Sequence, residues 1–106
     1  MNNPQRIERL EQMLKENSAD PFLLHALALE KVKIGDDVAA KDLFRKVVTG
    51  TPDYVGTYYH LAKLLERNGE TDAALQVYEQ GMEVARKLKD NHAWSELRSA
   101  YEELSF

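Results

Sequence analysis

The chain has 106 residues, of which 43% are apolar and 30% are charged, a balance typical of one soluble globular domain. It carries 14 basic and 18 acidic residues, and the resulting net charge of −4 argues against a nucleic-acid partner. The absence of cysteine excludes disulfides, thiolate metal sites and cysteine nucleophiles. No apolar run has the length of a membrane span, and the first six residues lack the apolar core of a signal peptide, so we expect a cytoplasmic protein that has no membrane partner.

The first predicted element is an amphipathic helix over residues 4–17. Ile7, Leu10 and Leu14 are spaced at i, i+3 and i+7, so they fall on one side of a helix. The residues between them are mostly charged and fit a solvent-facing side. We therefore expect this helix to bury one stripe against the rest of the chain.

A second helix is predicted over residues 21–34. Asp20 is a favourable N-cap, and Pro21 suits the first helical position because the N–H that it lacks has no partner there. Gly35 then ends the helix, since glycine readily adopts the left-handed conformation of a helix C-terminus. This helix is apolar around most of its circumference, which indicates that several of its sides are covered.

Four further helices follow, separated by short polar or glycine-containing segments, and no run of alternating polarity indicates a strand. We expect a third helix ending near Val48, a fourth from about Tyr54 to Asn68, a fifth ending near Lys89 and a sixth from about Ala93 to Leu104. Their expected N-caps are Asp36 or Asp37, Thr71 or Asp72, and Asp90–Asn91 for the third, fifth and sixth helices. Short links place neighbouring helices antiparallel.

The chain contains an internal repeat of 34 residues. A shift by this period superposes pairs of identical or similar residues at packing and turn positions. These pairs are Leu27–Ala28 with Leu61–Ala62, Gly35 with Gly69, Ala39–Ala40 with Ala73–Ala74, and Phe44 with Tyr78. A repeat of this length is typical of helical arrays in which each unit buries its apolar face against the next.

These residues resemble the tetratricopeptide repeat (TPR) family, whose unit is a 34-residue helix pair. The matching motifs are Leu24-x-x-Leu27-Ala28, Ala40-x-x-x-Phe44 and Pro52, then Tyr58-x-x-Leu61-Ala62 and Ala74-x-x-x-Tyr78, then Trp94-x-x-Leu97-x-x-x-Tyr101. The resemblance implies an all-α, antiparallel helix-pair solenoid of six helices in a right-handed superhelical stack. It divides a single domain, residues 1–106, into an N-terminal capping helix (4–17), repeat 1 (21–54), repeat 2 (55–90) and a C-terminal capping helix (91–104).

The motif residues have distinct packing roles. The alanines are small where two helix backbones come close, and the leucines and aromatics fill the space beside them. Gly81 lies inside the fifth helix, where glycine is about 1 kcal/mol less favourable than alanine. Two interpretations stay open, namely a tight contact with the final helix and simple tolerance of a glycine.

The sequence gives little support to an enzyme. The serines lack the glycine-flanked motif of a nucleophile, no glycine-rich loop is present, and no cofactor is expected. His25, His60 and His92 lie about 30 residues apart without a second ligand at metal-binding spacing. A small-ligand or metal site built on these histidines is kept as an alternative.

The resemblance also implies a non-catalytic scaffold that binds a protein or peptide in a concave groove lined by the first helix of each pair. The residues expected to bind the partner are Phe22, His25, Leu29, Val32, Lys33, Gly56, Tyr59, Lys63, Arg67 and His92. Some members of the family hold chaperone C-terminal carboxylates with Lys, Asn and Arg side chains. The corresponding positions here are His25, Leu29, His60, His92 and Glu96, so we expect no such binding.

Two questions about the surface stay open at this stage. The apolar helix 21–34 is either covered on its extra side by helix 4–17 or leaves Phe22 and Leu29, together with Tyr59, open to a partner. In addition, Phe106, Trp94 or the face of helix 4–17 offers apolar surface through which two copies form a weak homodimer.

Overall fold

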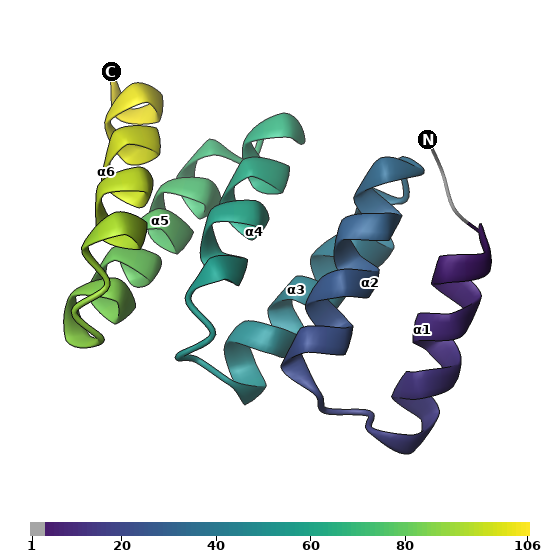
Figure 1. Ribbon diagram of the computed structural model, residues 1–106. Helices are drawn as coiled ribbons and strands as arrows, with labels where there is room; N and C mark the ends of the chain where they lie inside the picture. Colours follow the sequence, from purple (N-terminus) through teal and green to yellow (C-terminus); the bar gives the residue numbers. More distant parts are fainter. Residues whose placement is uncertain (1–3) are drawn as a thin grey trace. The chain divides into compact units, whose positions relative to one another are not determined.

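The computed structural model describes residues 4–106, and this part of the chain consists of six α-helices without a strand (Figure 1). The helices are α1 (Pro4–Glu16), α2 (Pro21–Lys33), α3 (Asp37–Gly50), α4 (Gly56–Arg67), α5 (Thr71–Lys87) and α6 (Asn91–Ser105). The expected all-α, helix-pair class is confirmed. No helix within the described range combines the length and the apolar character needed to cross a membrane.

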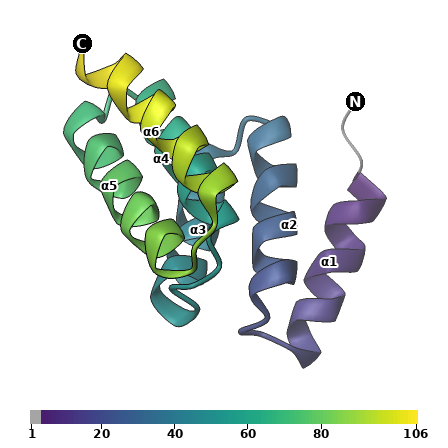
Figure 2. The same cartoon turned by 60° about the vertical axis from the view of Figure 1, so that its left-hand side comes forward.

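The chain forms two compact units that meet in sequence at Thr51 and Pro52. In the first unit α2 packs against α3 and α1 packs against α2; in the second unit α5 packs against both α4 and α6 (Figure 2). Each unit therefore contains one helix pair and one added helix. The single domain and its expected divisions at 4–17, 21–54, 55–90 and 91–104 stay predictions, as does the superhelical stack.

The turns after α2, α4 and α5 share one hydrogen-bond pattern. In each turn a backbone N–H donates to the carbonyl five residues earlier, and the residue before the donor has a positive φ angle. The donors and acceptors are Asp36 and Lys31 at 2.9 Å, Glu70 and Leu65 at 2.9 Å, and Asp90 and Ala85 at 2.8 Å. The positive φ angles belong to Gly35 (80°), Gly69 (78°) and Lys89 (60°), so one turn places a lysine where the others use glycine.

Aspartate caps three of the helices. The carboxylates of Asp20, Asp36 and Asp90 each accept a hydrogen bond from the backbone N–H three residues later, at 3.1, 3.2 and 3.0 Å. The expected cap of α5 at Thr71 or Asp72 is wrong, because the helix already begins at Thr71 and its N-cap is Glu70. The turn at Gly69 fixes this register, and the Glu70 side chain makes no cap hydrogen bond.

Four helix ends differ from the expectation by two residues. The third helix continues beyond Val48 to Gly50, because the Thr51 N–H still donates to the Val47 carbonyl at 2.7 Å. The fourth begins at Gly56 rather than Tyr54, whose carbonyl accepts the Thr57 N–H across a tight turn at 3.3 Å. The fifth ends at Lys87, just before the turn that contains Lys89. The sixth helix begins at Asn91 rather than Ala93, because its N-cap is Asp90, whose carboxylate accepts a hydrogen bond from the Ala93 N–H.

Each unit has a small core that includes the repeated residues. In the first unit Leu10 of α1 packs against a buried patch of α2 made of Leu23, Ala26 and Leu27. Within both units the four repeated alanines are completely buried, as expected where helices pack closely. They are Ala28, Ala40, Ala62 and Ala74.

Gly81 of α5 lies in a tight contact with two helices. A Cβ atom added there would lie 2.7 Å from the Cβ atom of Tyr58 in α4 and 3.0 Å from the Cδ1 atom of Leu97 in α6. Both distances are shorter than ordinary carbon–carbon contacts. The expected tight contact with the final helix is confirmed, it extends to α4, and the interpretation as simple tolerance is wrong.

Candidate functional site

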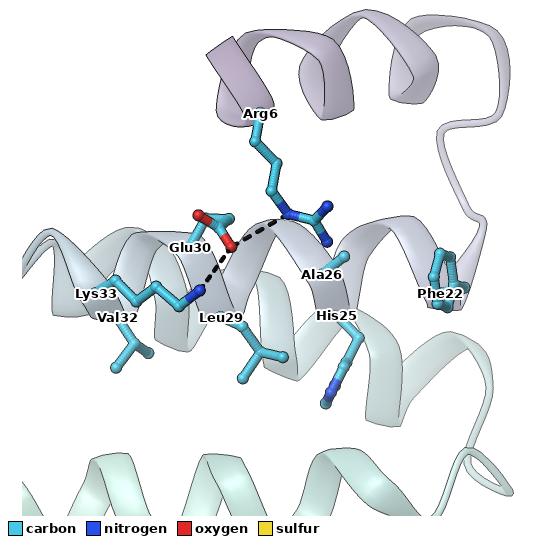
Figure 3. Close-up of a pocket in the computed structure, with 8 residues that line it drawn as sticks. All are labelled: Arg6, Phe22, His25, Ala26, Leu29, Glu30, Val32 and Lys33. Carbon is cyan, nitrogen blue, oxygen red and sulfur yellow. Dashed lines mark hydrogen bonds and ion pairs between the residues drawn. The ribbon is translucent and has the colours of Figure 1, made fainter. Parts of the chain in front are cut away.

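A hollow of about 520 Å³ lies beside α2 in the first unit (Figure 3). Its lining includes all five residues of this helix that were expected to bind a partner: Phe22, His25, Leu29, Val32 and Lys33. Steps of three or four residues lead from Phe22 to His25, to Leu29 and then to Val32 or Lys33, which puts them along one side of α2. Ala26, Glu30 and Arg6 complete the lining.

The apolar part of the hollow is accessible at one end. Phe22 is 62% exposed at the start of α2, whereas Leu29 and Val32 are partly buried. Figure 3 shows His25, Leu29 and Val32 pointing to the same side of α2, away from α1. The His25 ring lies 5.7 Å from the Phe44 ring, so α3 supports this side of the hollow.

α1 covers one side of α2 and leaves another open. Leu10 packs over Leu23 and Leu27, while Phe22 stays largely exposed. Coverage by the first helix and exposure to a partner, the two interpretations of the apolar helix 21–34, therefore each describe part of it. One part of its extra apolar surface packs against α1, and another part lines the hollow.

Three charged side chains meet at the other end of the hollow. One carboxylate oxygen of Glu30, Oε2, accepts hydrogen bonds from Arg6 Nε at 3.2 Å and from Lys33 Nζ at 3.1 Å (Figure 3). Arg6 comes from α1 and lies 24 positions from Glu30 in sequence. Arg6, Ala26 and Glu30 were not among the residues predicted from the sequence. The local signal for this cluster is the position of Glu30, three residues before Lys33 within a largely apolar helix.

The second unit carries another set of the expected residues on α4. Gly56, Tyr59, Lys63 and Arg67 recur at three- and four-residue spacing along this helix. The Lys63 ammonium lies 5.7 Å from the centroid of the Tyr59 ring, a cation–π distance, and 3.6 Å from a carboxylate oxygen of Glu66. His92 lies at the start of α6 and is exposed.

A partly buried hydrogen bond connects α5 to α4. The hydroxyl of Tyr78, a fully buried residue of α5, donates to a carboxylate oxygen of Glu66. Burial and the adjacent Glu66 carboxylate raise the pKa of the Tyr78 hydroxyl above its usual range. The phenol therefore stays protonated, and it orients the carboxylate that also attracts Lys63.

Comparison with known proteins decides the family. The family model described as tetratricopeptide repeat matches residues 35–101, which is more than half of the chain. The chain belongs to the tetratricopeptide repeat family. The TPR motifs that suggested this assignment lie on α2 to α6.

Solved structures give the same assignment. This TPR chain is 47% identical to a tetratricopeptide repeat domain protein from Salinibacter ruber, with 80% of this chain and 86% of that one covered at a TM-score of 0.78. A protein from Bordetella parapertussis is 26% identical over 99% of this chain and 90% of that one, at a TM-score of 0.81. The type III secretion translocator chaperone SycD of Yersinia enterocolitica shares the fold at 14% identity, covering 93% and 69% at a TM-score of 0.84. No protein of curated function matched the chain.

The histidines of this TPR chain do not cluster with other ligands. Among residues 4–106, no three His, Cys, Asp or Glu side chains gather as a group that could hold a metal ion. His25 packs on Phe44, and the His60 ring lies 5.7 Å from the Tyr59 ring in an edge-on arrangement. His25, itself an expected partner-binding residue, therefore contacts a core ring, and His60 contacts the expected partner-binding residue Tyr59.

Proposed function

We propose that this TPR chain is a non-catalytic module that binds a peptide or protein segment through the exposed faces of α2 and α4. The hollow beside α2 carries the proposal, because its lining includes every α2 residue that the family resemblance assigns to partner binding. Its volume of about 520 Å³ is within the range of ordinary ligand sites. Because the chain has a net charge of −4, which repels the phosphates of a nucleic acid, we expect a protein partner.

Two aromatic side chains favour a protein partner. Phe22 is mostly exposed in the first unit, and Tyr59 is partly exposed on α4 of the second. Large aromatic side chains surrounded by a polar frame, above all tyrosine and tryptophan, often contribute much of the binding energy at protein interfaces. Lys63 and Arg67 on α4, and Lys33 on α2, supply that polar frame here.

Affinity capture with matched variants tests this function. We expect Leu29→Ala and Tyr59→Ala each to lose a partner that the wild-type chain captures from its native host, because each removes an anchor. Val38→Ala is the control, since Val38 is 82% exposed on α3 and lies outside both faces. Circular dichroism checks that all variants keep the wild-type helix content. Retention of the partner by both anchor variants would contradict the proposal.

Self-association is the second candidate function, because apolar side chains are exposed away from the hollow. Phe106 is 98% exposed and Met13 on α1 is partly exposed. Light scattering over a range of protein concentrations tests this alternative. A measured molar mass that remains that of a single chain at the highest protein concentration would contradict this alternative.

A further inference from the structure

The hollow beside α2 is positively charged at one end. Arg6 and Lys33 share the Glu30 carboxylate, so the three side chains carry two positive charges and one negative charge. The side chain of Glu30 is only 5% exposed, whereas those of Arg6 and Lys33 are 52% and 56% exposed. An approaching ligand therefore meets the cations, while the buried carboxylate beneath them holds them in position.

The remaining lining of the hollow is mainly apolar, with Phe22, Ala26, Leu29 and Val32 beside the polar ring of His25. A purely apolar partner that covered the hollow would remove water from two cations without replacing it, which is unfavourable. A purely acidic partner would leave Leu29 and Phe22 in water. The lining therefore fits a partner that offers an apolar group and an anion together.

The spacing of these groups sets the spacing in the partner. Leu29 and Lys33 lie one turn apart, which is about 6 Å along a helix axis. In an extended peptide, side chains two positions apart point to the same side and are separated by about 6.6 Å. We propose that the hollow selects an extended segment in which an apolar residue and a carboxylate residue are two positions apart. The apolar side chain lies on Leu29, and the carboxylate contacts Lys33 and Arg6.

This inference rests on the proposed function and adds the chemistry of the partner. Its test uses two blocked peptides, Ac-Gly-Leu-Ser-Glu-Gly-amide and the same peptide with glutamine in place of glutamate. The full chain, labelled with ¹⁵N, is titrated with each peptide and followed by NMR. We expect shifts of backbone amides between residues 22 and 33, and an affinity for the glutamate peptide about three to five times higher at low salt. The difference shrinks as salt is added, because the attraction is screened.

Variants of Lys33 and Arg6 distinguish recognition of the peptide's carboxylate from binding that does not depend on charge. We expect Lys33→Gln to reduce the preference for the glutamate peptide, and Arg6→Gln to do the same. Lys33→Glu reverses the preference, so that a peptide with lysine in place of glutamate binds better than the glutamate peptide. Lys46→Glu is the control, because Lys46 is equally exposed on α3 but lies outside the hollow. Circular dichroism establishes that each variant is folded, and the two glutamine variants suffice if Lys33→Glu does not fold.

Three results would overturn the inference: equal affinities for the glutamate and glutamine peptides, amide shifts that map away from α2, or no saturable binding of either peptide. The broader proposal fails on a different result, the retention of the captured partner by both Leu29→Ala and Tyr59→Ala. A chain that loses its partner in these variants but treats the two peptides alike would overturn only the inference about the carboxylate.

Discussion

A single methyl group added at Gly81 meets two neighbouring helices at once. In Gly81→Ala the new Cβ atom would lie 2.7 Å from the Cβ atom and 3.1 Å from the Cγ atom of Tyr58, and 3.0 Å from the Cδ1 atom of Leu97. The Cβ atom of Tyr58 is attached directly to the backbone of α4, so rotation of a side chain cannot relieve the contact. The methyl group is accommodated only if α4 and α5 move apart.

The magnitude follows from two opposing effects. Replacing glycine by alanine inside a helix stabilises it by about 1 kcal/mol. Forcing an extra carbon into a packed core costs about 1–3 kcal/mol, and a contact of 2.7 Å belongs at the upper end of that range. We therefore expect Gly81→Ala to lower the free energy of unfolding by about 1–2 kcal/mol, equivalent to a Tm lower by roughly 5–10 °C.

Urea unfolding followed by circular dichroism measures this loss. Gly56→Ala is the matched control in the same unit, because a Cβ atom there has no neighbour within 4 Å. We expect this control to equal the wild type or to gain a few tenths of a kcal/mol. If Gly81→Ala is as stable as the wild type while the control behaves as described, the close packing of α4, α5 and α6 around Gly81 is refuted.

Three further predictions concern single side chains. Leu61→Ala removes a fully buried side chain and should cost roughly 2–5 kcal/mol in urea unfolding, whereas a cost below about 1 kcal/mol would contradict its place in the core. Lys89 adopts a left-handed conformation with a φ of 60°, which glycine tolerates better than lysine. Lys89→Gly should therefore raise the free energy of unfolding by up to about 1 kcal/mol and raise the Tm, and a lower Tm would contradict this. The raised pKa of Tyr78 means that the folded chain keeps a proton that the unfolded chain loses above about pH 10. Its contribution is complete below that pH and is lost progressively as the pH rises above it. Wild-type stability should therefore fall more steeply than that of Tyr78→Phe between pH 9 and 11, and equal slopes would contradict the assignment.

The helices and their turns were largely predictable from the sequence because their signals are local. The cap at Asp20, the proline that follows it and the glycines after α2 and α4 act on hydrogen bonds within about five residues. The errors were also local. Thr71 and Asp72 are favourable caps, but the turn at Gly69 had already fixed the register of α5 at Glu70.

The candidate site was predictable only in part. The five α2 residues were assigned from the family resemblance, and helical periodicity places them on one side of the helix. The charged end of the hollow was not predicted, because Arg6 and Glu30 lie 24 positions apart and meet only when α1 folds against α2. No spacing rule within one helix relates these two residues.

The sequence by itself determined the six helices, their pairing and the small residues at which the helices pack, since periodicity and short links dictate these features. The tertiary structure decided the role of Gly81. A glycine inside a helix lowers its intrinsic stability by the same amount whether or not another helix packs against it, so the sequence does not reveal the contact. The tertiary structure also decided that Glu30 is buried beneath two cations. Both facts depend on distances between residues far apart in the chain, which only packing fixes.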